Sequence, residues 1–320
     1  MEEIVHEPVM PSEVVHLIAP RAGDTIVDCT FGAGGHARRI APALGAGGLY
    51  IAIDRDPSVR AHYAAFAADV PCATRLVRAN FADALPQLGR EEVRADAVLM
   101  DLGVSSMQVD IPERGFSYAR QAPLDMRMDP DDECSAADLV ASSSETELAD
   151  VFRRLGEERH ARPIARAIVR RRANVPITTT ADLVEVIRGA LPTPALFAGG
   201  HPAKRVFQAL RIAVNDELGS LEAGLEAAFE ILVPGGRPAV IAFHSLEDRL
   251  VKRFMAARAR GCVCPPDLPA CVCGREPEGV LVAPKAVRPR IDEVNRNPRS
   301  RSARLRVIEK AGAGQRPLAA

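Results

Sequence analysis

The sequence predicts a doubly wound α/β fold with a mostly parallel sheet and an inserted all-helical domain. Through the first hundred residues, short β-rich apolar runs alternate with helical patterns, the runs falling at 26–29, 49–53, 74–77 and 97–102. Such alternation is typical of parallel βαβ units. The strand pattern stops after Leu102 and resumes only at 238–243. Between these points the periodicity predicts helices.

Helix signals mark the elements of the insertion. Ser144 and Glu147 form a capping box ahead of an apolar helical face, and Thr180 is expected to cap the next helix. Apolar residues spaced three or four apart then predict one long helix over 207–232, ended by Pro-Gly-Gly at 234–236. We therefore expect a sheet domain in two parts, 1–106 and 213–320, around an inserted helical domain at 107–212.

Length and composition are those of a soluble two-domain protein. The 320 residues exceed what one core usually organises, about 250 to 300. The first ten residues lack the basic and apolar pattern of a secretory signal, and no apolar run approaches the roughly 20 residues that span a bilayer. The seven cysteines form no secreted disulfide framework, so we expect a cytoplasmic protein with no membrane partner. The net charge of -1 means that any nucleic-acid binding depends on local clusters of Arg and Lys.

A glycine-rich turn follows the first predicted strand and opens a helix. It reads Thr-Phe-Gly-Ala-Gly-Gly-His-Ala over 30–37. Doubly wound sheets bind ligands at the carboxyl ends of their strands, and glycines there allow close approach of the backbone. Asp54, at the end of the second predicted strand, could accept from ribose hydroxyls. Because Gly32, Gly34 and Ala37 also satisfy the dinucleotide fingerprint, a nicotinamide enzyme is a rival interpretation.

The acids around this turn favour S-adenosylmethionine. Asp28 lies four residues before the first glycine, whereas a dinucleotide loop usually begins with glycine directly at the strand end. S-adenosylmethionine has no pyrophosphate but carries a sulfonium and an amino group, which suit several carboxylates. Asp28, Asp54 and Asp101 all fall at carboxyl ends of predicted strands. The alternative for each one is a helix-capping role.

Several longer motifs then resemble one family. They are Asp-Leu-Gly-Val-Ser-Ser at 101–106, Arg-Gly-Phe-Ser at 114–117, Pro-Leu-Asp-Met-Arg-Met-Asp at 123–129, and the segments 207–212, 214–218, 243–249 and 297–303. Together with His36 they resemble the bacterial small-subunit ribosomal RNA cytosine-N4 methyltransferases, the RsmH (MraW) family. The resemblance covers essentially the whole chain.

This resemblance implies a class I S-adenosylmethionine-dependent methyltransferase that acts on 16S ribosomal RNA within the small ribosomal subunit, at a cytidine in the decoding centre. No protein partner is implied. The cofactor contacts that it implies are Gly34, Gly35, His36, Asp54, Phe81, Asp101 and Gln108. Phe81 would lie against the adenine, although a single aromatic at a strand end is more often part of the core. A non-catalytic assembly factor that binds ribosomal RNA is the alternative function, and erosion of the glycine turn or of Asp101 would mark it.

The reaction of this family needs an oriented amine. The exocyclic N4 of cytidine is a poor nucleophile because its lone pair is delocalised, so hydrogen-bond acceptors must aim it at the methyl group. The candidates are Asp101 and the carbonyls of Leu102 and Gly103. Asp125 and Asp129 are alternatives, unless they form salt bridges with Arg127 or nearby arginines. No general base is assigned, since proton loss can follow methyl transfer.

Two basic clusters are candidates for RNA contact. Residues 153–172 hold eight Arg against two Glu, and Arg162, Arg166 and Arg170 recur every fourth residue on one predicted helical face. Residues 285–310 hold nine basic and three acidic side chains, including Arg299 and Arg301. Both clusters suit phosphate binding, and the alternative is a solvated charged face.

Two Cys-x-Cys pairs lie close together in the chain: Cys262, Cys264, Cys271 and Cys273. Four thiols could form a tetrahedral zinc site, but zinc knuckles usually have a wider gap within each pair. Reduced thiols and a disulfide are the alternatives. From the sequence alone we assign no metal.

Overall fold

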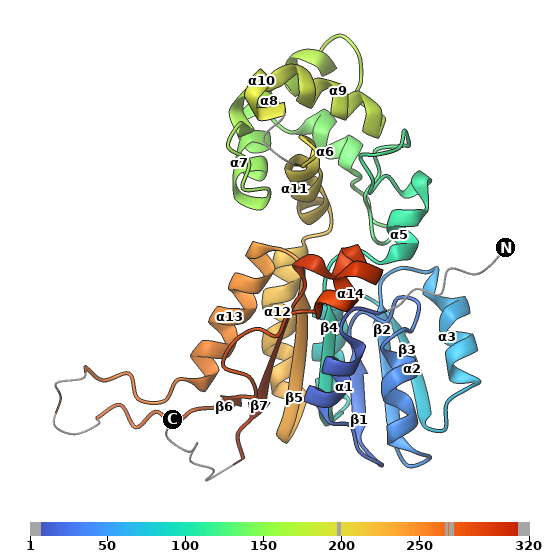
Figure 1. Cartoon of the computed structure of the whole chain (residues 1–320), viewed down its shortest axis with the longest axis vertical. Coiled ribbons are helices and arrows are strands. Elements are labelled where there is room, and N and C mark those ends of the chain that lie inside the picture. The colour runs from blue at the N-terminus through green and yellow to red at the C-terminus, as the bar shows by residue number, and fades with distance from the viewer. Residues whose placement is uncertain (1–7, 197–199, 266–267, 269–271, 313–320) are drawn as a thin grey trace. The chain divides into compact units, whose positions relative to one another are not determined.

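The computed structural model describes residues 8–196, 200–265, 268 and 272–312. The chain divides into two compact units (Figure 1). A sheet unit comprises Met1–Gly103 and Gly219–Ala320, and a helical unit comprises Val104–Leu218. The helical unit thus begins before and ends after the segment 107–212 that the sequence suggests for the insertion.

The sheet unit is built on seven strands in the order β3-β2-β1-β4-β5-β7-β6. Strands β1 to β5 are parallel, whereas β7 is antiparallel to both β5 and β6. The predicted doubly wound, mostly parallel fold is therefore confirmed. The bounds are β1 Thr25–Asp28, β2 Leu49–Asp54, β3 Ala73–Arg78, β4 Ala95–Asp101, β5 Leu232–Ala242, β6 Gly279–Leu281 and β7 Arg304–Lys310.

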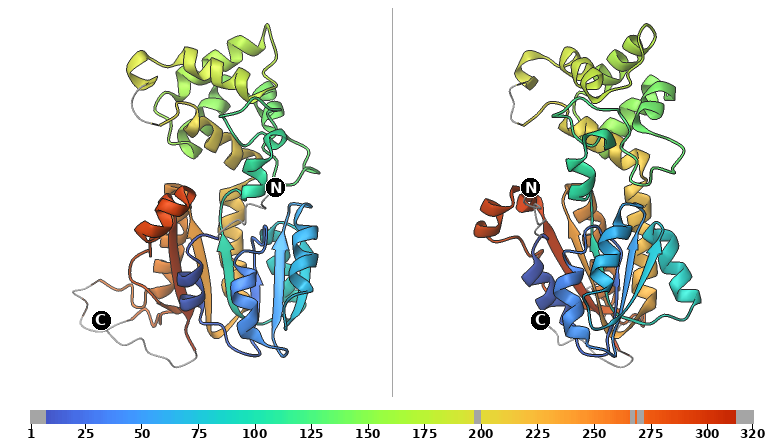
Figure 2. Two further views of the ribbon diagram at one scale, coloured as in Figure 1. Left: turned by 45° about the vertical axis from the view of Figure 1, so that its right-hand side comes forward. Right: turned by 90° about the vertical axis from the view of Figure 1, so that its right-hand side faces the viewer.

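Helices cover both faces of this sheet, which is why strands such as β2 are apolar on both sides. On one face, α4 (Phe81–Arg90), α12 (Glu217–Ile231) and α13 (Ser245–Ala259) enclose the main core. On the other face, α3 (Val59–Ala67) packs Phe66 edge-on to Tyr50 of β2. Figure 2 shows the blue helices α1 (Pro11–Ile18) and α2 (Ala37–Ile40) on the side opposite the teal α4. The 3₁₀ turn η1 (Ala41–Leu44) follows α2, and α14 (Ile291–Arg296) and η3 (Pro298–Ser302) precede β7.

The helical unit packs its helices around a second core. These are α5 (Ser106–Asp110), α6 (Ala136–Ser142), α7 (Glu145–Leu155), α8 (Ala161–Arg172), α9 (Thr180–Ala190), α10 (Thr193–Leu196) and α11 (Lys204–Val214), with the 3₁₀ turn η2 (Pro112–Arg114). The apolar faces of α6 to α9 and α11 meet in one buried cluster, as amphipathic periodicity requires. The predicted capping box of Ser144 and Glu147 begins α7.

The predicted single helix over 207–232 is wrong. The structure has two helices, α11 and α12, because Asp216 adopts the left-handed conformation with φ 43°. The break is stabilised by Asn215, whose amide accepts from the Met128 nitrogen at 2.7 Å and donates to the Met126 carbonyl at 2.8 Å. A buried side chain that satisfies two distant backbone groups can outweigh helix periodicity.

Two smaller expectations also need correction. Thr179, not Thr180, caps α9, and the Thr180 hydroxyl instead donates to the Arg120 carbonyl at 2.6 Å. The Pro-Gly-Gly segment at 234–236 lies within β5, next to a register shift opposite β4, rather than ending a helix. Gly235 there has φ 83°, which favours glycine.

No helix within the described ranges is both long enough and apolar enough to cross a membrane.

Candidate functional site

Three predicted carboxylates lie at one edge of the sheet. Asp28, Asp54 and Asp101 are the last residues of β1, β2 and β4, as the sequence predicts. In the strand order β2-β1-β4 these strands are neighbours, so their carboxyl ends meet. The chain reverses its winding direction between β1 and β4, and doubly wound sheets bind ligands at such a switch point.

The glycine turn that follows β1 passes close beside β2. Gly32 and Gly34 have φ 54° and 77°, a backbone conformation that residues other than glycine rarely adopt. A Cβ on Gly34 would lie 2.9 Å from the ring of Phe31, and one on Gly35 would lie 3.1 Å from Pro8. The turn is therefore shaped for glycine at these positions, and a ligand can approach its backbone.

Asp54 holds this turn in place. One of its carboxylate oxygens accepts from the Gly32 amide at 2.8 Å, and the other accepts from the Asp56 amide at 2.9 Å. Burial raises the pKa of Asp54 to about 6, although both hydrogen bonds oppose this rise. The sequence predicts that Asp54 accepts from a ribose. The structure adds a second role, which is to hold the backbone of the glycine turn, and the spacing of residues in the sequence does not reveal this role.

Asp28 is a structural acid. It is 1% exposed, and its oxygens accept from the Tyr50 hydroxyl at 2.8 Å and the Thr30 amide at 3.1 Å. Burial raises its pKa to about 6. Because both oxygens accept from groups of the protein, Asp28 shapes the site through Thr30 rather than through a ligand contact.

His36 and Asp101 present polar atoms that other described residues leave unsatisfied. The His36 Nε2 lies 3.4 Å from the Asp101 Oδ2. Neither ring nitrogen of His36, nor the Asp101 Oδ1, has a hydrogen-bond partner among the described residues, although all three atoms are buried. Asp101 is fixed by its own amide, which donates to the Thr30 hydroxyl at 2.7 Å. Buried polar atoms are nearly always satisfied, so these atoms fit a polar ligand at the switch point.

Phe81 is mostly part of the core. It begins α4, is 9% exposed and packs in the main cluster, where a Cβ on Gly224 of α12 would lie 2.5 Å from its ring. The neighbouring Asn80, which sequence reasoning did not single out, caps α4 and donates to the Ser220 hydroxyl at 2.7 Å. Little of the Phe81 side chain is therefore left for a ligand to contact.

Gln108, a predicted cofactor contact, and Asp125, an alternative candidate for orienting the amine, belong to the helical unit. Gln108 is 4% exposed and completes a capping box at α5, where its side chain accepts from the Ser105 amide at 3.1 Å. Asp125 pairs with Arg127 through two contacts of 2.8 Å, and this pairing outweighs burial and lowers its pKa. The salt-bridge alternative for Asp125 therefore accounts for its carboxylate.

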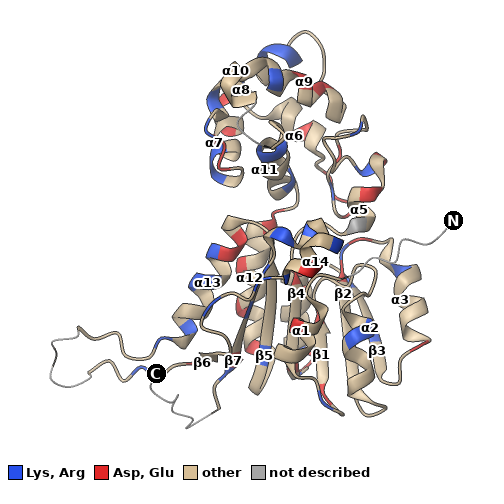
Figure 3. Cartoon of the chain, viewed as in Figure 1, with Lys and Arg blue, Asp and Glu red and all other residues tan. Residues whose placement is uncertain are grey.

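The predicted RNA-contact arginines are exposed in both units. Arg162, Arg166 and Arg170 lie on α8 opposite its buried face, and Arg166 also approaches Glu145 at 3.3 Å. Figure 3 shows further basic segments on α7 and α11. Arg299 and Arg301 are exposed on η3, directly before β7. Since β7 begins beside the last residue of β5, these two arginines approach the edge of the sheet that carries Asp101.

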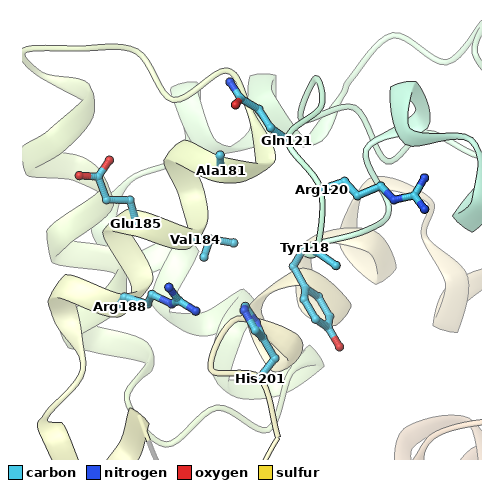
Figure 4. A pocket seen from close by; sticks show the side chains of 9 residues that line it. Tyr118, Arg120, Gln121, Ala181, Val184, Glu185, Arg188 and His201 are labelled. Atoms are coloured by element: carbon cyan, nitrogen blue, oxygen red, sulfur yellow. The ribbon is translucent and has the colours of Figure 1, made fainter.

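A hollow of about 430 Å³ lies within the helical unit (Figure 4). Tyr118 and His201 stack in it with ring centroids 4.4 Å apart and 12° between their planes. Arg120, Gln121 and Arg188 also line it, and burial together with the charge of Arg188 lowers the pKa of His201. Aromatic rings beside cations are typical of sites that bind unstacked nucleobases and phosphates, although the acidic Glu185 also lines this hollow.

Comparison with known proteins identifies the family of the chain. Residues 3–311 match the model of the MraW methylase family. The ribosomal RNA small subunit methyltransferase H of Symbiobacterium thermophilum is 51% identical over 313 residues, covering 97% of this chain and 98% of the relative. The protein of the same name from Rubrobacter xylanophilus is 50% identical over 304 residues, covering 94% and 95%. A solved structure described as a putative rRNA-methylase from Clostridium thermocellum aligns with a TM-score of 0.44 at 12% identity, covering 97% and 99%, a likeness too weak to carry an argument.

Proposed function

This chain belongs to the MraW methylase family, and we propose that it methylates the exocyclic N4 of a cytidine in the decoding centre, near the P site, of small-subunit 16S ribosomal RNA. It is an S-adenosylmethionine-dependent methyltransferase, and its doubly wound sheet is the fold of that class. Family membership thereby decides against the nicotinamide alternative. The observation that carries the proposal is the group of buried polar atoms of His36 and Asp101 that have no hydrogen-bond partner among the described residues, at the switch point of the sheet.

The residues that bind the cofactor lie around this switch point. Gly34 and Gly35 let the backbone approach the cofactor, and Asp54 accepts from the ribose while holding the glycine turn. His36 and Asp101 bind the polar end of the methionine moiety. The small exposed part of Phe81 contacts the adenine. When bound, S-adenosylmethionine supplies an electrophilic methyl group on a sulfonium.

Asp101 and the two residues after it orient the amine. The Leu102 amide donates to the Ile241 carbonyl at 3.0 Å, so the backbone that leaves β4 is fixed to β5. This anchoring preorganises the carbonyls of Leu102 and Gly103 as acceptors for the two N4 hydrogens. The amine loses its proton only after it becomes cationic, so the residues act mainly by positioning. The target cytidine leaves its stack to reach them.

RNA binding uses basic surfaces on both units. The α8 arginines Arg162, Arg166 and Arg170 contact phosphates, and so do Arg299 and Arg301. The hollow that contains Tyr118 and His201 receives an unstacked base or a phosphate near it. A substrate with several contact points explains why a structured subunit, rather than free cytidine, would be the substrate.

Methyl transfer to isolated small subunits tests the proposal. Subunits from cells that lack this protein are incubated with the purified protein and isotope-labelled S-adenosylmethionine, and the RNA is digested and analysed by mass spectrometry. We expect labelled N4-methylcytidine at one decoding-centre position. Asp101→Asn should slow the reaction about a hundredfold or more, because it removes the negative charge and replaces one acceptor oxygen by an NH2 group that donates instead.

Asp96→Asn is the matched control, because Asp96 lies near the other end of the same strand and accepts from the Thr25 amide at 2.8 Å. It should leave the rate within a few-fold of the unsubstituted protein. A methyl group on a different base or atom would contradict the assignment to N4. Tight binding of subunits and of S-adenosylmethionine without any transfer would favour the non-catalytic assembly factor instead.

A further inference from the structure

We propose that the loop after α13 holds a structural zinc ion through the thiolates of Cys262, Cys264 and Cys273. The Sγ atoms of these residues all lie within 4.8 Å of one another, and those of Cys262 and Cys273 are 3.8 Å apart. Cys271, which the sequence places in the same cluster, lies outside the described residues. The proposal concerns the stability of this loop and is independent of methyl transfer.

The sulfur separation fits a metal better than a disulfide. Zinc binds thiolates at about 2.3 Å, and tetrahedral geometry then places two sulfurs about 3.8 Å apart. A disulfide would require about 2.05 Å. The described cysteines Cys262, Cys264 and Cys273 are thiols. Three thiolates leave one tetrahedral position for a further donor or water.

The loop is closed at its base, directly before the thiols. The Glu278 amide donates to the Arg258 carbonyl at 2.8 Å, and the side chains of these two residues form an ion pair. One step further, a Cβ on Gly261 would lie 3.2 Å from the ring of Pro277. The two arms of the loop thus run together before they reach the cysteines. This closure lowers the entropic cost of assembling ligands that are distant in sequence.

Apolar packing does not explain why the thiols gather. The described aliphatic side chains of the loop, Val263, Leu268 and Val272, are 45%, 40% and 80% exposed. A loop that buries so little apolar surface gains little from the hydrophobic effect. A bound metal ion supplies that missing stabilisation in small metal-binding segments.

The local hydrogen bonding favours a thiolate. The Cys264 amide lies 3.4 Å from the Cys262 sulfur and donates to it. Amide donation to a ligand sulfur stabilises its charged form, as the partners around metal ligands generally do. Binding converts the three thiols to thiolates and releases their protons to solvent, so the zinc affinity should increase with pH.

The metal content of untagged protein, purified without chelator and dialysed, tests the site. By elemental mass spectrometry we expect about one zinc per chain, as one tetrahedral site requires. Cys262→Ser and Cys273→Ser should each lower the content at least tenfold. Cys134→Ser, which changes an exposed cysteine of the helical unit, should retain the metal. Circular dichroism of each variant confirms that the two units remain folded.

Cobalt substitution provides a second readout. Apo-protein loaded with Co²⁺ should show thiolate-to-cobalt charge-transfer bands and the strong visible bands of a tetrahedral site. Both signals should disappear in Cys262→Ser. The proposal fails if folded protein takes up neither zinc nor cobalt while its thiols react fully with a thiol reagent. It also fails if both serine variants retain zinc, because another site would then hold the metal.

Discussion

Asp54 should make cofactor binding depend on pH. Burial raises its pKa to about 6, while the amides of Asp56 and Gly32 donate to its charged form. A ribose hydroxyl donates to an ionised carboxylate, whereas a protonated carboxyl offers fewer acceptor sites. The ionised form should therefore bind more tightly. Affinity should be constant well above pH 6 and should fall as the pH drops through that value.

The raised pKa of Asp54 sets the size of this effect. With a pKa of about 6, roughly one molecule in eleven carries the ionised carboxylate at pH 5, and nearly all do at pH 8. The dissociation constant should thus increase about tenfold between pH 8 and pH 5, equivalent to about 1.4 kcal/mol. Loss of the carboxylate should cost more, because an amide side chain cannot accept from both backbone donors, and a buried unsatisfied amide costs about 1–3 kcal/mol.

Calorimetric titration with S-adenosylhomocysteine, which carries the same ribose, measures the dissociation constant from pH 5 to pH 8. Asp54→Asn should bind at least tenfold more weakly at pH 8 and should lose the pH dependence. Asp24→Asn serves as the control, since Asp24 accepts from the Arg21 amide before β1 begins, at the opposite end of the sheet. It should keep the original profile. An affinity that does not change between pH 5 and pH 8, or a slope that persists in Asp54→Asn, would refute the role of Asp54.

Two other variants have defined outcomes. Because burial raises the pKa of Asp28 to about 6, above the value near 4 of an unfolded chain, its contribution to stability is greatest below pH 4 and is lost as the pH rises to about 6. The free energy of unfolding of the original protein minus that of Asp28→Asn, from urea titrations, should therefore decrease by up to roughly 3 kcal/mol between pH 4 and pH 7; a constant difference would argue against a raised pKa. Changing Arg162, Arg166 and Arg170 together to Glu should weaken RNA binding and flatten its salt dependence. Cofactor affinity should remain unchanged, and an equal loss of both would indicate misfolding.

The sequence predicted those features that local patterning controls. Strands β1, β2, β3 and β4 follow from short apolar runs, and the positions of Asp54 and Asp101 follow from where those runs end. The cap of α7 follows from Ser144 and Glu147, since a capping box is encoded within four residues. Such features need no knowledge of distant contacts.

Features that depend on long-range contacts were not predictable in this way. The break between α11 and α12 rests on Asn215, which binds the backbone of Met126 and Met128 far away in the chain. The burial of Phe81 depends on Gly224, which leaves room for its ring. Neither contact can be predicted from the helical periodicity of the sequence or from the position of a residue at the end of a strand. The family resemblance suggested a ligand role for Phe81, and only the fold shows how little of the ring a ligand can reach.

The carboxylates of the sheet edge favour a cationic ligand at the proposed cofactor site. Burial raises the pKa values of Asp28 and Asp54, and the nearby charge of Asp101 raises that of Asp28 further. A ligand with positive charge would relieve this repulsion and compensate for the desolvation, whereas a pyrophosphate would add to it. The chain uses Asp28 and Asp54 to fix the backbone of the turn, and this leaves Asp101 with an oxygen directed to no protein donor that the structure describes. The same arrangement therefore positions the turn and keeps one acceptor available for the cofactor or for the amine.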